Sequence, residues 1–281
     1  MIVDCHTHIF APDIIANREA HLQQEEWFAH LYGPTNAPMA SAEELVAEMD
    51  RCGVRQSVVC GFAWDSFDLY VETNSYIADA ASRFPGRLIA FANVPPLHPR
   101  AAAELERCLG LRFRGIGELK PDGQDFDLVD GESLEWLTSL AQEHDLPLLV
   151  HLSEPVGRLY PGKGRTSPRK GFDFAVRHPG LKLIYAHWGG GLPFYELMPD
   201  VRQALVNVWY DCAASPYLYR PEIYRVALDI IGREKILFGS DYPLISPERY
   251  LKELDGLGLE DKDHEAILGG NAQALFGLGT A

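Results

Sequence analysis

The chain has 281 residues, of which 47% are hydrophobic and 23% are charged, and its formal net charge is −15. This composition excludes a disordered chain. The acidic balance argues against nucleic acid as a partner, because phosphate binding needs a basic surface. The longest apolar runs are far too short to cross a bilayer, so no membrane contact is expected.

The beginning of the chain and its cysteines indicate a cellular compartment. Met1 leads directly into Ile2 and Val3 without a basic or apolar leader, so we expect a cytoplasmic location. The five cysteines are scattered and lack CxxC spacing. We therefore expect them to be reduced, and mostly buried as small apolar residues.

Eight short apolar segments rich in β-branched residues predict strands that are buried on both faces, as in a parallel sheet. In chain order they are residues 2–9, 56–62, 87–94, 115–120, 147–152, 181–187, 206–212 and 235–241. A helix is predicted after Ser41, where Glu44 completes a capping box, and it should end at Gly53. Further helices are predicted at residues 67–84, 99–109, 134–144, 169–178, 221–231 and 247–254.

Strand–helix repeats that run along the chain without a linker predict one (β/α)8 barrel, a TIM barrel, spanning residues 1–281. A doubly wound open sheet also alternates strands and helices, so the count alone leaves that option open. Two connections exceed the usual length, residues 10–40 after the first strand and 153–168 after the fifth. We expect both to wall an active site at the C-terminal face of the barrel.

Metal-ligand side chains stand at the ends of several predicted strands. His6 and His8 are two residues apart on the first strand, so both rings can face one point. Imidazole suits zinc and other first-row metals. His151, His187 and Asp241 close three further predicted strands. In a barrel these strand ends surround one cavity, so the pattern favours a barrel with a metal site over an open sheet.

The chain resembles a known family. His6-Thr7-His8, the segments LPLLVH and LKLIYAHWGG, the run ILFGSDYP and the closing ILGGN are similar to amidohydrolase family 2. That branch of the amidohydrolase superfamily includes metal-dependent hydrolases and aminocarboxymuconate-semialdehyde decarboxylase-like enzymes, and the resemblance covers nearly the whole chain. It implies one divalent metal, usually Zn2+, held by His6, His8, His151 and Asp241. It also implies a catalytic or oxyanion-side role for His187, or a place as second-metal ligand.

Several properties of the metal site stay open at this point. Nitrogen and oxygen ligands also accept Mn2+, Fe2+ or Co2+. Glu118 and Lys120 share one face at the end of the fourth strand. By resemblance, Glu118 could be a fifth ligand or bridge a second metal, as in deoxyribonuclease-like relatives, and a carboxylated Lys120 could imitate other two-metal relatives. Alternatively, both residues orient the ligands or pair with each other. Relatives are frequently dimers, so a homodimer is a further option.

Substrate contacts are expected from the two long connections and from the segment after His187. Trp27, Arg158, Arg165 and Trp188 are the candidates. Arginine offers a two-pronged donor for a substrate carboxylate, although charged loop residues are often simply solvated. Three glycines at 189–191 either allow a tight turn or, with the predicted helix 192–197, form an anion site.

Hydrolysis of a small-molecule amide, ester or lactone is the main functional expectation. A bound cation lowers the pKa of its water to roughly 7, Asp241 can act as general acid and base, and His187 can stabilise the developing oxyanion. The alternative is nonoxidative decarboxylation of a small carboxylic acid that is anchored on the metal. Some decarboxylating relatives replace the first histidine by glutamate, whereas this chain keeps His6. A third hypothesis is a noncatalytic, metal-containing barrel that binds a ligand.

Overall fold

The computed structural model describes residues 1–33 and 37–278. Residues 34–36, which fall in the expected connection 10–40, and residues 279–281, the end of the expected domain 1–281, lie outside the described residues. The described part of the chain forms an eight-stranded parallel sheet in which the strands pair in chain order. They are β1 (Ile2–His8), β2 (Val54–Cys60), β3 (Leu88–Ala92), β4 (Gly115–Leu119), β5 (Leu148–Val150), β6 (Leu183–Tyr185), β7 (Val208–Asp211) and β8 (Ile236–Leu237).

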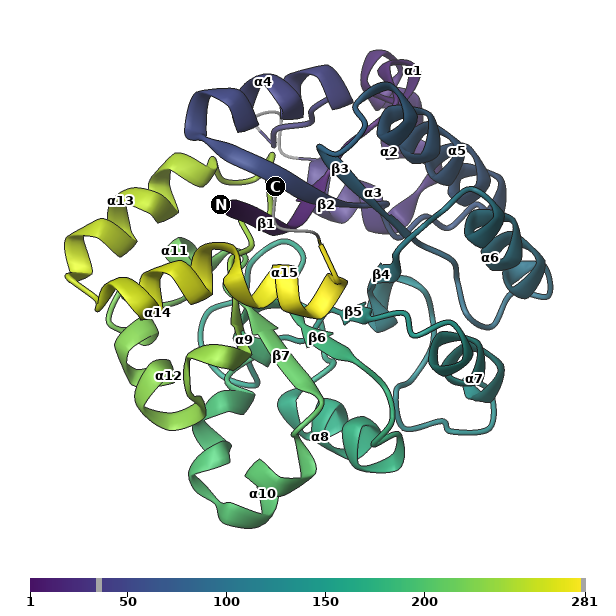
Figure 1. The fold of residues 1–281 in the computed structure, drawn as a ribbon. Coiled ribbons are helices and arrows are strands. Elements are labelled where there is room, and N and C mark those ends of the chain that lie inside the picture. The colour runs from purple at the N-terminus through teal and green to yellow at the C-terminus, as the bar shows by residue number, and fades with distance from the viewer. Residues whose placement is uncertain (34–36, 279–281) are drawn as a thin grey trace.

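The sheet curves into a barrel whose first and last strands meet. The backbone N–H of Cys5 donates to the Phe238 carbonyl at 2.7 Å, and that of Asp241 donates to the His6 carbonyl at 2.9 Å. Helices surround this ring of strands (Figure 1). The (β/α)8 barrel predicted from the sequence is confirmed, and the open sheet is excluded by the bonds between the two ends.

The helices between the strands agree with the predicted ones to within a few residues. They are α4 (Ala42–Cys52), α5 (Phe67–Arg83), α6 (Ala101–Gly110), α7 (Glu135–Glu143), α8 (Pro168–Arg177), α12 (Ile223–Ile231) and α13 (Pro247–Leu257). The capping box of α4 is present, because Glu44 N–H donates to Ser41 Oγ at 3.3 Å and Ser41 N–H donates to Glu44 Oε2 at 2.7 Å. Gly53 ends α4 at a φ of 72°, which glycine tolerates without steric cost.

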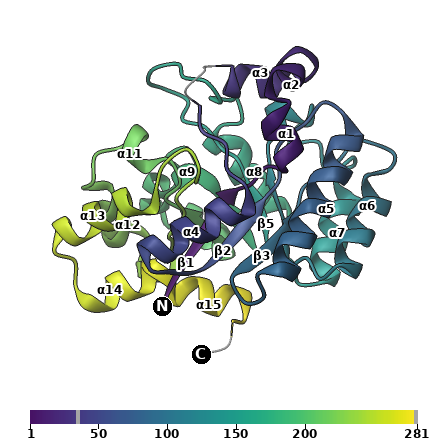
Figure 2. The same cartoon turned by 90° about the horizontal axis from the view of Figure 1, so that it is seen from above.

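The expected loop 10–40 contains helices that its sequence did not predict. They are α1 (Pro12–Ala16), α2 (Arg18–Gln24) and α3 (Glu26–Tyr32), each too short for a helical repeat of apolar residues to be recognised. Figure 2 shows them at one end of the barrel, opposite α15 (Asn271–Phe276) and the N-terminus. The remaining helical segments are η1 (Pro121–Gly123), α9 (Ala186–Gly189), η2 (Leu192–Leu197), α10 (Pro199–Ala204), α11 (Ser215–Leu218), η3 (Arg233–Lys235), α14 (Asp261–Glu265) and η4 (Ala266–Gly270).

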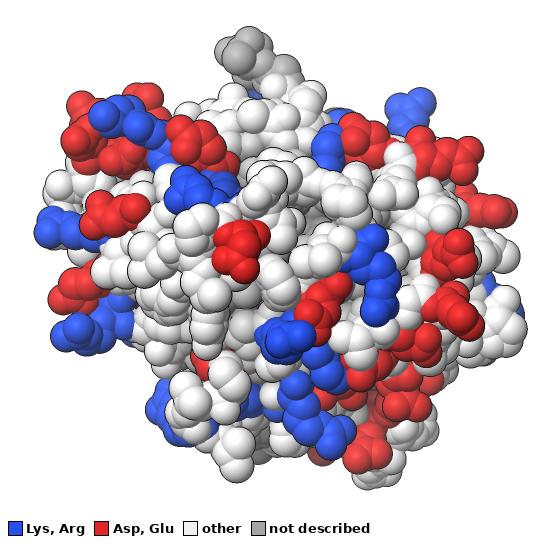
Figure 3. All heavy atoms as spheres, turned by 90° about the horizontal axis from the view of Figure 1, so that it is seen from below, with Lys and Arg blue, Asp and Glu red and all other residues white. Residues whose placement is uncertain are grey.

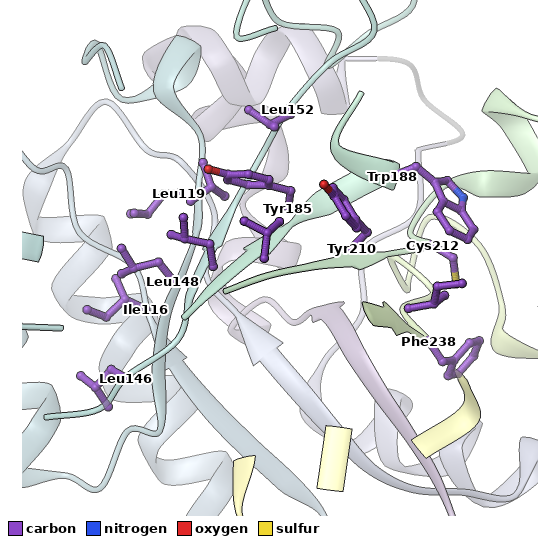
Figure 4. Close-up of a cluster of buried hydrophobic side chains, with 14 of the residues drawn as sticks. Ile116, Leu119, Leu146, Leu148, Leu152, Tyr185, Trp188, Tyr210, Cys212 and Phe238 are labelled. Carbon is purple, nitrogen blue, oxygen red and sulfur yellow. The ribbon is translucent and has the colours of Figure 1, made fainter. Parts of the chain in front are cut away.

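Two apolar layers hold the barrel together. A small cluster joins side chains from six strands, among them Val3, Val58 and Leu237, so it must fill the barrel interior, and α15 packs on its end through Leu275. A larger cluster lies between the strands and the outer helices, and Figure 4 shows the part around Tyr210. The interior packing therefore occupies the end near the termini and leaves the opposite end for polar groups.

The distribution of charged residues on the surface and the state of the cysteines agree with the expectations from the sequence. On the face in Figure 3, acidic and basic side chains surround a largely uncharged centre. All five cysteines are free, and four of them are buried. Among the described residues, no helix combines the length and the apolar character that a membrane span requires.

Candidate metal centre

Two histidines of β1 reach the polar end of the barrel through an irregular strand. Val3 and Cys5 point into the interior apolar cluster, and successive side chains of a regular strand alternate between its faces. His6 would then point outwards. The pairing of β1 with β2 shifts between Asp4 and Thr7, and His6 and His8 lie in the polar cluster instead.

His187 and Asp241 lie beyond the ends of their strands, which differs from the predicted strands 181–187 and 235–241. Strand β6 ends at Tyr185 and β8 ends at Leu237, whereas His151 directly follows β5. Both His187 and Asp241 have left-handed backbones, with φ of 58° and 60°. Such a conformation costs free energy in a residue with a side chain and is concentrated at functional sites. A sharp turn, rather than strand geometry, therefore aims these two side chains.

The first group of ligand atoms comes from His6, His8 and Asp241. The Nε2 atoms of His6 and His8 are 3.1 Å apart. Asp241 Oδ1 lies 3.8 Å from the former and 3.5 Å from the latter. Since zinc–nitrogen bonds measure about 2.0–2.1 Å, neighbouring ligands of one tetrahedral ion lie roughly 3.4 Å apart. The three atoms thus have a spacing that fits one cation.

The second group comes from Glu118, His151 and His187, and Glu118 connects it to the first. Glu118 Oε1 lies 2.8 Å from His151 Nδ1 and 3.3 Å from His187 Nε2. The other oxygen, Oε2, lies 3.7 Å from His6 Nε2 and 3.8 Å from His8 Nε2. The preceding residue must be glycine, because a Cβ on Gly117 would lie 2.4 Å from the Leu149 carbonyl oxygen. The Glu118 carboxylate therefore stands between two sets of ligand atoms.

Three of the histidines have their other ring nitrogen occupied by an acceptor. His6 Nδ1 donates to Asp211 Oδ2 at 2.9 Å, His8 Nδ1 to the Gly61 carbonyl at 3.2 Å, and His187 Nδ1 to the Ala213 carbonyl at 3.0 Å. These bonds place the proton on Nδ1 and leave each Nε2 lone pair for a metal, as is usual for metal-binding histidines. The chain's donor set therefore fits a divalent metal.

Asp211 is a residue that the sequence analysis missed. Its other oxygen, Oδ1, accepts the backbone N–H groups of His187 at 2.9 Å and Ala213 at 3.0 Å, so this one carboxylate holds both the His6 ring and the turn at His187. The available signal was an acidic residue at the end of a predicted strand, the same signal that identified Asp241.

Electrostatic attraction between the histidines and the carboxylates determines the ionisation of the carboxylates in this cluster. Burial opposes ionisation of Glu118, but the neighbouring His151 and His6 outweigh it and hold the pKa of Glu118 well below its usual range. The pKa of Asp241 is lowered in the same way by His8, His6 and His187, again against the effect of burial. The two carboxylates are therefore anionic and suited to a cation.

A cavity of about 490 Å³ opens onto these ligands. Its floor contains His8, Glu118, His151, His187 and Asp241, together with Lys120. Its walls are mostly apolar and come largely from the two long connections, as expected, and from the segments after β2, β7 and β8. They include Leu31, Tyr32, Phe62, Tyr160, Pro161, Leu218, Pro243 and Leu244. The cavity has the volume and composition of a small-molecule site.

The predicted substrate-binding residues have different positions. Arg158 lines the cavity, and Trp27 lies behind its floor, with Lys120 Nζ 5.2 Å from the ring centre. The Arg165 side chain is 96% exposed and faces Asp122, outside the cavity lining. Trp188 also lies outside that lining, because its ring is fully buried against Tyr224 and its Nε1 donates to Ser215. Arg158 therefore stays a candidate for substrate contact, whereas Trp27, Arg165 and Trp188 lie outside the cavity lining.

The three glycines after Trp188 serve a tight turn. All have positive φ, at 54°, 61° and 99°, and a Cβ on Gly190 would lie 2.5 Å from the Ser153 carbonyl oxygen. The segment that follows, η2, is a short 3-10 helix. Of the two sequence interpretations, the geometry supports the turn and gives no support to an anion site.

Comparisons with known proteins agree with this architecture. The family model described as amidohydrolase matches residues 3–278. A γ-resorcylate decarboxylase from Polaromonas sp. is 27% identical over 244 residues, which cover 73% of this chain and 75% of that protein. An L-fucono-1,5-lactonase from Burkholderia ambifaria is 24% identical, covering 86% of this chain and 80% of that one.

A similar fold has been solved with a metal. The structure of a dihydroxybenzoic acid decarboxylase from Polaromonas sp., with bound manganese and the inhibitor 2-nitroresorcinol, superposes with a TM-score of 0.75. Sequence identity is 20%, and the match covers 100% of this chain and 98% of that one. This likeness extends the agreement in fold over the entire barrel.

Proposed function

The chain belongs to the amidohydrolase family, and on that basis we propose that it catalyses the nonoxidative decarboxylation of a small aromatic carboxylic acid with the help of a divalent metal. The observation that carries the proposal is the cavity, whose apolar walls accept a ring while its floor presents metal ligands and a lysine to an acidic group. The related decarboxylases support this alternative over the hydrolysis that we expected first.

In this proposal His6, His8 and Asp241 hold the metal, with Glu118 or His151 completing the set. Manganese in the related decarboxylase makes Mn2+ a candidate beside Zn2+. When bound, the metal supplies positive charge that anchors an anionic substrate oxygen and stabilises negative charge during the reaction. The walls exclude water from the floor, which strengthens these electrostatic interactions.

His187 is our candidate for the proton donor. Its Nδ1 is held by the Ala213 carbonyl, so Nε2 is the atom that can carry a transferable proton. Burial disfavours the charged ring, but the hydrogen bond to Glu118 and the charge of Asp241 outweigh it and raise the pKa of His187. Transfer of this proton to the ring carbon that bears the carboxyl group lets the carbon–carbon bond break. Carbon dioxide leaves, and the bonding electrons return to the ring.

Hydrolysis is a second candidate, favoured by the position of Glu118 between two ligand groups. With Glu118 in that position, the two groups of residues could hold two metals, which would supply an activated water for hydrolysis. His151 and His187 would then be ligands of the second metal, and His187 would not be free to donate a proton. Asp241 would accept the proton of the water. The related lactonase fits this reading.

Metal content and product analysis together test the proposal. The protein, purified without chelator and supplied with Mn2+ or Zn2+, is incubated separately with hydroxybenzoic acids and with sugar lactones. About one metal per chain and release of carbon dioxide from an aromatic acid would support decarboxylation. Two metals per chain, with lactone opening and no carbon dioxide, would replace it by hydrolysis. The chelator-treated protein is the control in each assay.

A further inference from the structure

Lys120 occupies an unusual position on the cavity floor. It follows β4 directly, two residues after Glu118, and its side chain lines the cavity although the residue is only 7% exposed. Its Nζ lies 3.3 Å from His151 Nε2 and 3.4 Å from His151 Nδ1. The amine is therefore buried immediately beside the proposed metal ligands.

Within residues 1–33 and 37–278, no carboxylate lies within 4.0 Å of the Lys120 amine. Glu118 is engaged by His151, and Asp122 accepts three hydrogen bonds from the segment around Thr166. A buried ammonium without a carboxylate in contact is costly, because the His151 ring and the Trp27 ring replace the lost water only in part. Because Lys120 lines the cavity, a molecule bound there can supply the negative charge that is not in contact with the amine.

The surroundings favour a planar, anionic ligand. Trp27 covers one side of Lys120 with its ring face, which attracts the cation but supplies no negative charge. Lys120 also lines the cavity, to which Phe62 and Leu31 contribute apolar walls. In such a weakly polar environment, a hydrogen bond between an ammonium and a carboxylate or phenolate oxygen is stronger than in water.

From these contacts we infer that Lys120 is the specificity-determining residue that binds an anionic oxygen of the substrate while the reacting group lies at the metal ligands. The inference deepens the proposed function and rests on it for the identity of the reaction, but the recognition of an anion by Lys120 can be measured without turnover. The substrate class is a small aromatic acid, and neutral analogues of the same shape are discriminated against.

The test is a binding measurement with two probes of nearly equal shape, benzoate and benzamide. Isothermal titration on the metal-loaded protein compares the wild type with Lys120→Met. Lys182→Met is the matched control, because it removes the same charge at a lysine that pairs with Asp145 outside the cavity. We expect benzoate affinity to fall about 10-fold in Lys120→Met alone, with benzamide affinity and metal content unchanged.

Three results would overturn the inference. One is equal affinity of the wild type for benzoate and benzamide, which needs no variant. Another is unchanged benzoate binding in Lys120→Met. The third is loss of metal from that variant, which would make Lys120 a carboxylated metal ligand. Failure of this inference can be told apart from failure of the proposed function. If no aromatic acid releases carbon dioxide, the proposed function is wrong, but the preference for benzoate over benzamide and its dependence on Lys120 can still be measured.

Discussion

Two lysines of this protein, Lys120, which is buried, and Lys235, which is half-buried, have opposite surroundings. Beneath η2, Lys235 Nζ lies 2.7 Å and 2.8 Å from the two oxygens of Glu196 and donates to the Leu205 carbonyl at 2.8 Å. The Tyr210 hydroxyl donates to the same carboxylate at 2.8 Å. On the cavity floor, Lys120 has ring nitrogens and an indole face around it, and no carboxylate within ion-pair distance among the described residues.

The difference in surroundings indicates that the Lys235 charge stabilises the fold, whereas the Lys120 charge is placed to bind a ligand. Burial lowers the pKa of both amines, and nearby carboxylates oppose the effect in each case. At Lys235 the opposing group is in contact and belongs to the fold. At Lys120 the opposing carboxylates are more distant, so the charge contributes little to the stability of the fold. A buried charge that the protein itself leaves unpaired in a cavity indicates binding.

The largest expected effect comes from removing the metal ligands beside Lys120. Replacing Asp241 or His6 by alanine should lower turnover by roughly 1,000-fold or more, because several kcal/mol of charge stabilisation are lost with the metal. Elemental analysis and initial rates measure it. The circular dichroism spectrum should be retained, since α15 and the interior apolar cluster hold the opposite end of the barrel. Full activity in metal-free Asp241→Ala would contradict the assignment.

The second-largest effect is expected when Lys235, the lysine that stabilises the fold, is replaced. Lys235→Met leaves Glu196 buried without its ionic partner, and breaking a buried pair in this way costs about 3–5 kcal/mol of unfolding free energy. Urea denaturation measures the loss. Metal content per folded chain should stay at the wild-type value, because Lys235 lies outside the cavity lining. A loss of unfolding free energy below about 1 kcal/mol would contradict the structural role of Lys235 and its contrast with Lys120.

The same substitution at Lys120 should affect stability far less. Lys120→Met removes a buried charge that has no carboxylate within ion-pair distance in the described part of the chain, and an apolar side chain of similar length fills the space. Such replacements are often neutral or stabilising, so we expect a change within about 1 kcal/mol, or a gain. The comparison with Lys235→Met in one denaturation series is the measurement. A loss as large as that of Lys235→Met would indicate that Lys120 is structural.

The smallest effect is expected at an exposed ion pair, which sets the lower end of this series. Hydrogen bonds from Lys252 and Arg51 lower the pKa of Glu248 to about 2. Its contribution is therefore present above the unfolded value of about 4.5 and is lost as the pH falls towards 2. Glu248→Gln should lower the urea midpoint slightly at pH 7 and leave it unchanged near pH 2. A larger loss at low pH than at pH 7 would reverse the expected sign.

The sequence analysis predicted the strands well and their ends less well. Apolar β-branched runs recur because every strand is buried on both faces, and this local pattern is visible without a structure. Residues 181–187 and 235–241 were both predicted as strands up to the last residue, but the chain turns sharply before His187 and Asp241. The apolar pattern could not reveal these turns, because the segments stay buried after leaving the sheet.

The candidate site was predictable in its residue types but not in its contacts. His6, His8, His151, His187 and Asp241 were identified by their positions at strand ends, and all of them lie in the two ligand groups. Asp211 was missed although it stands at the end of a predicted strand, because its role depends on contacts with His6 and with the turn at His187. The wall helices α1 to α3 were missed because each is short and has no apolar repeat of its own. Ile14 of α1 and Phe28 of α3 are instead buried in a cluster with Trp64, which follows β2.

The barrel and the kinds of side chain at its C-terminal end could be predicted from the amino-acid sequence, because both follow from the local alternation of buried strands and helices. The folded barrel, in contrast, places Glu118 between two groups of ligands, lets Asp211 orient His6, and buries Lys120 with no carboxylate of residues 1–33 and 37–278 within ion-pair distance. These relations join strands that are far apart in the chain. They exist only once the ring of eight strands has closed and the turns at His187 and Asp241 have aimed their side chains inwards.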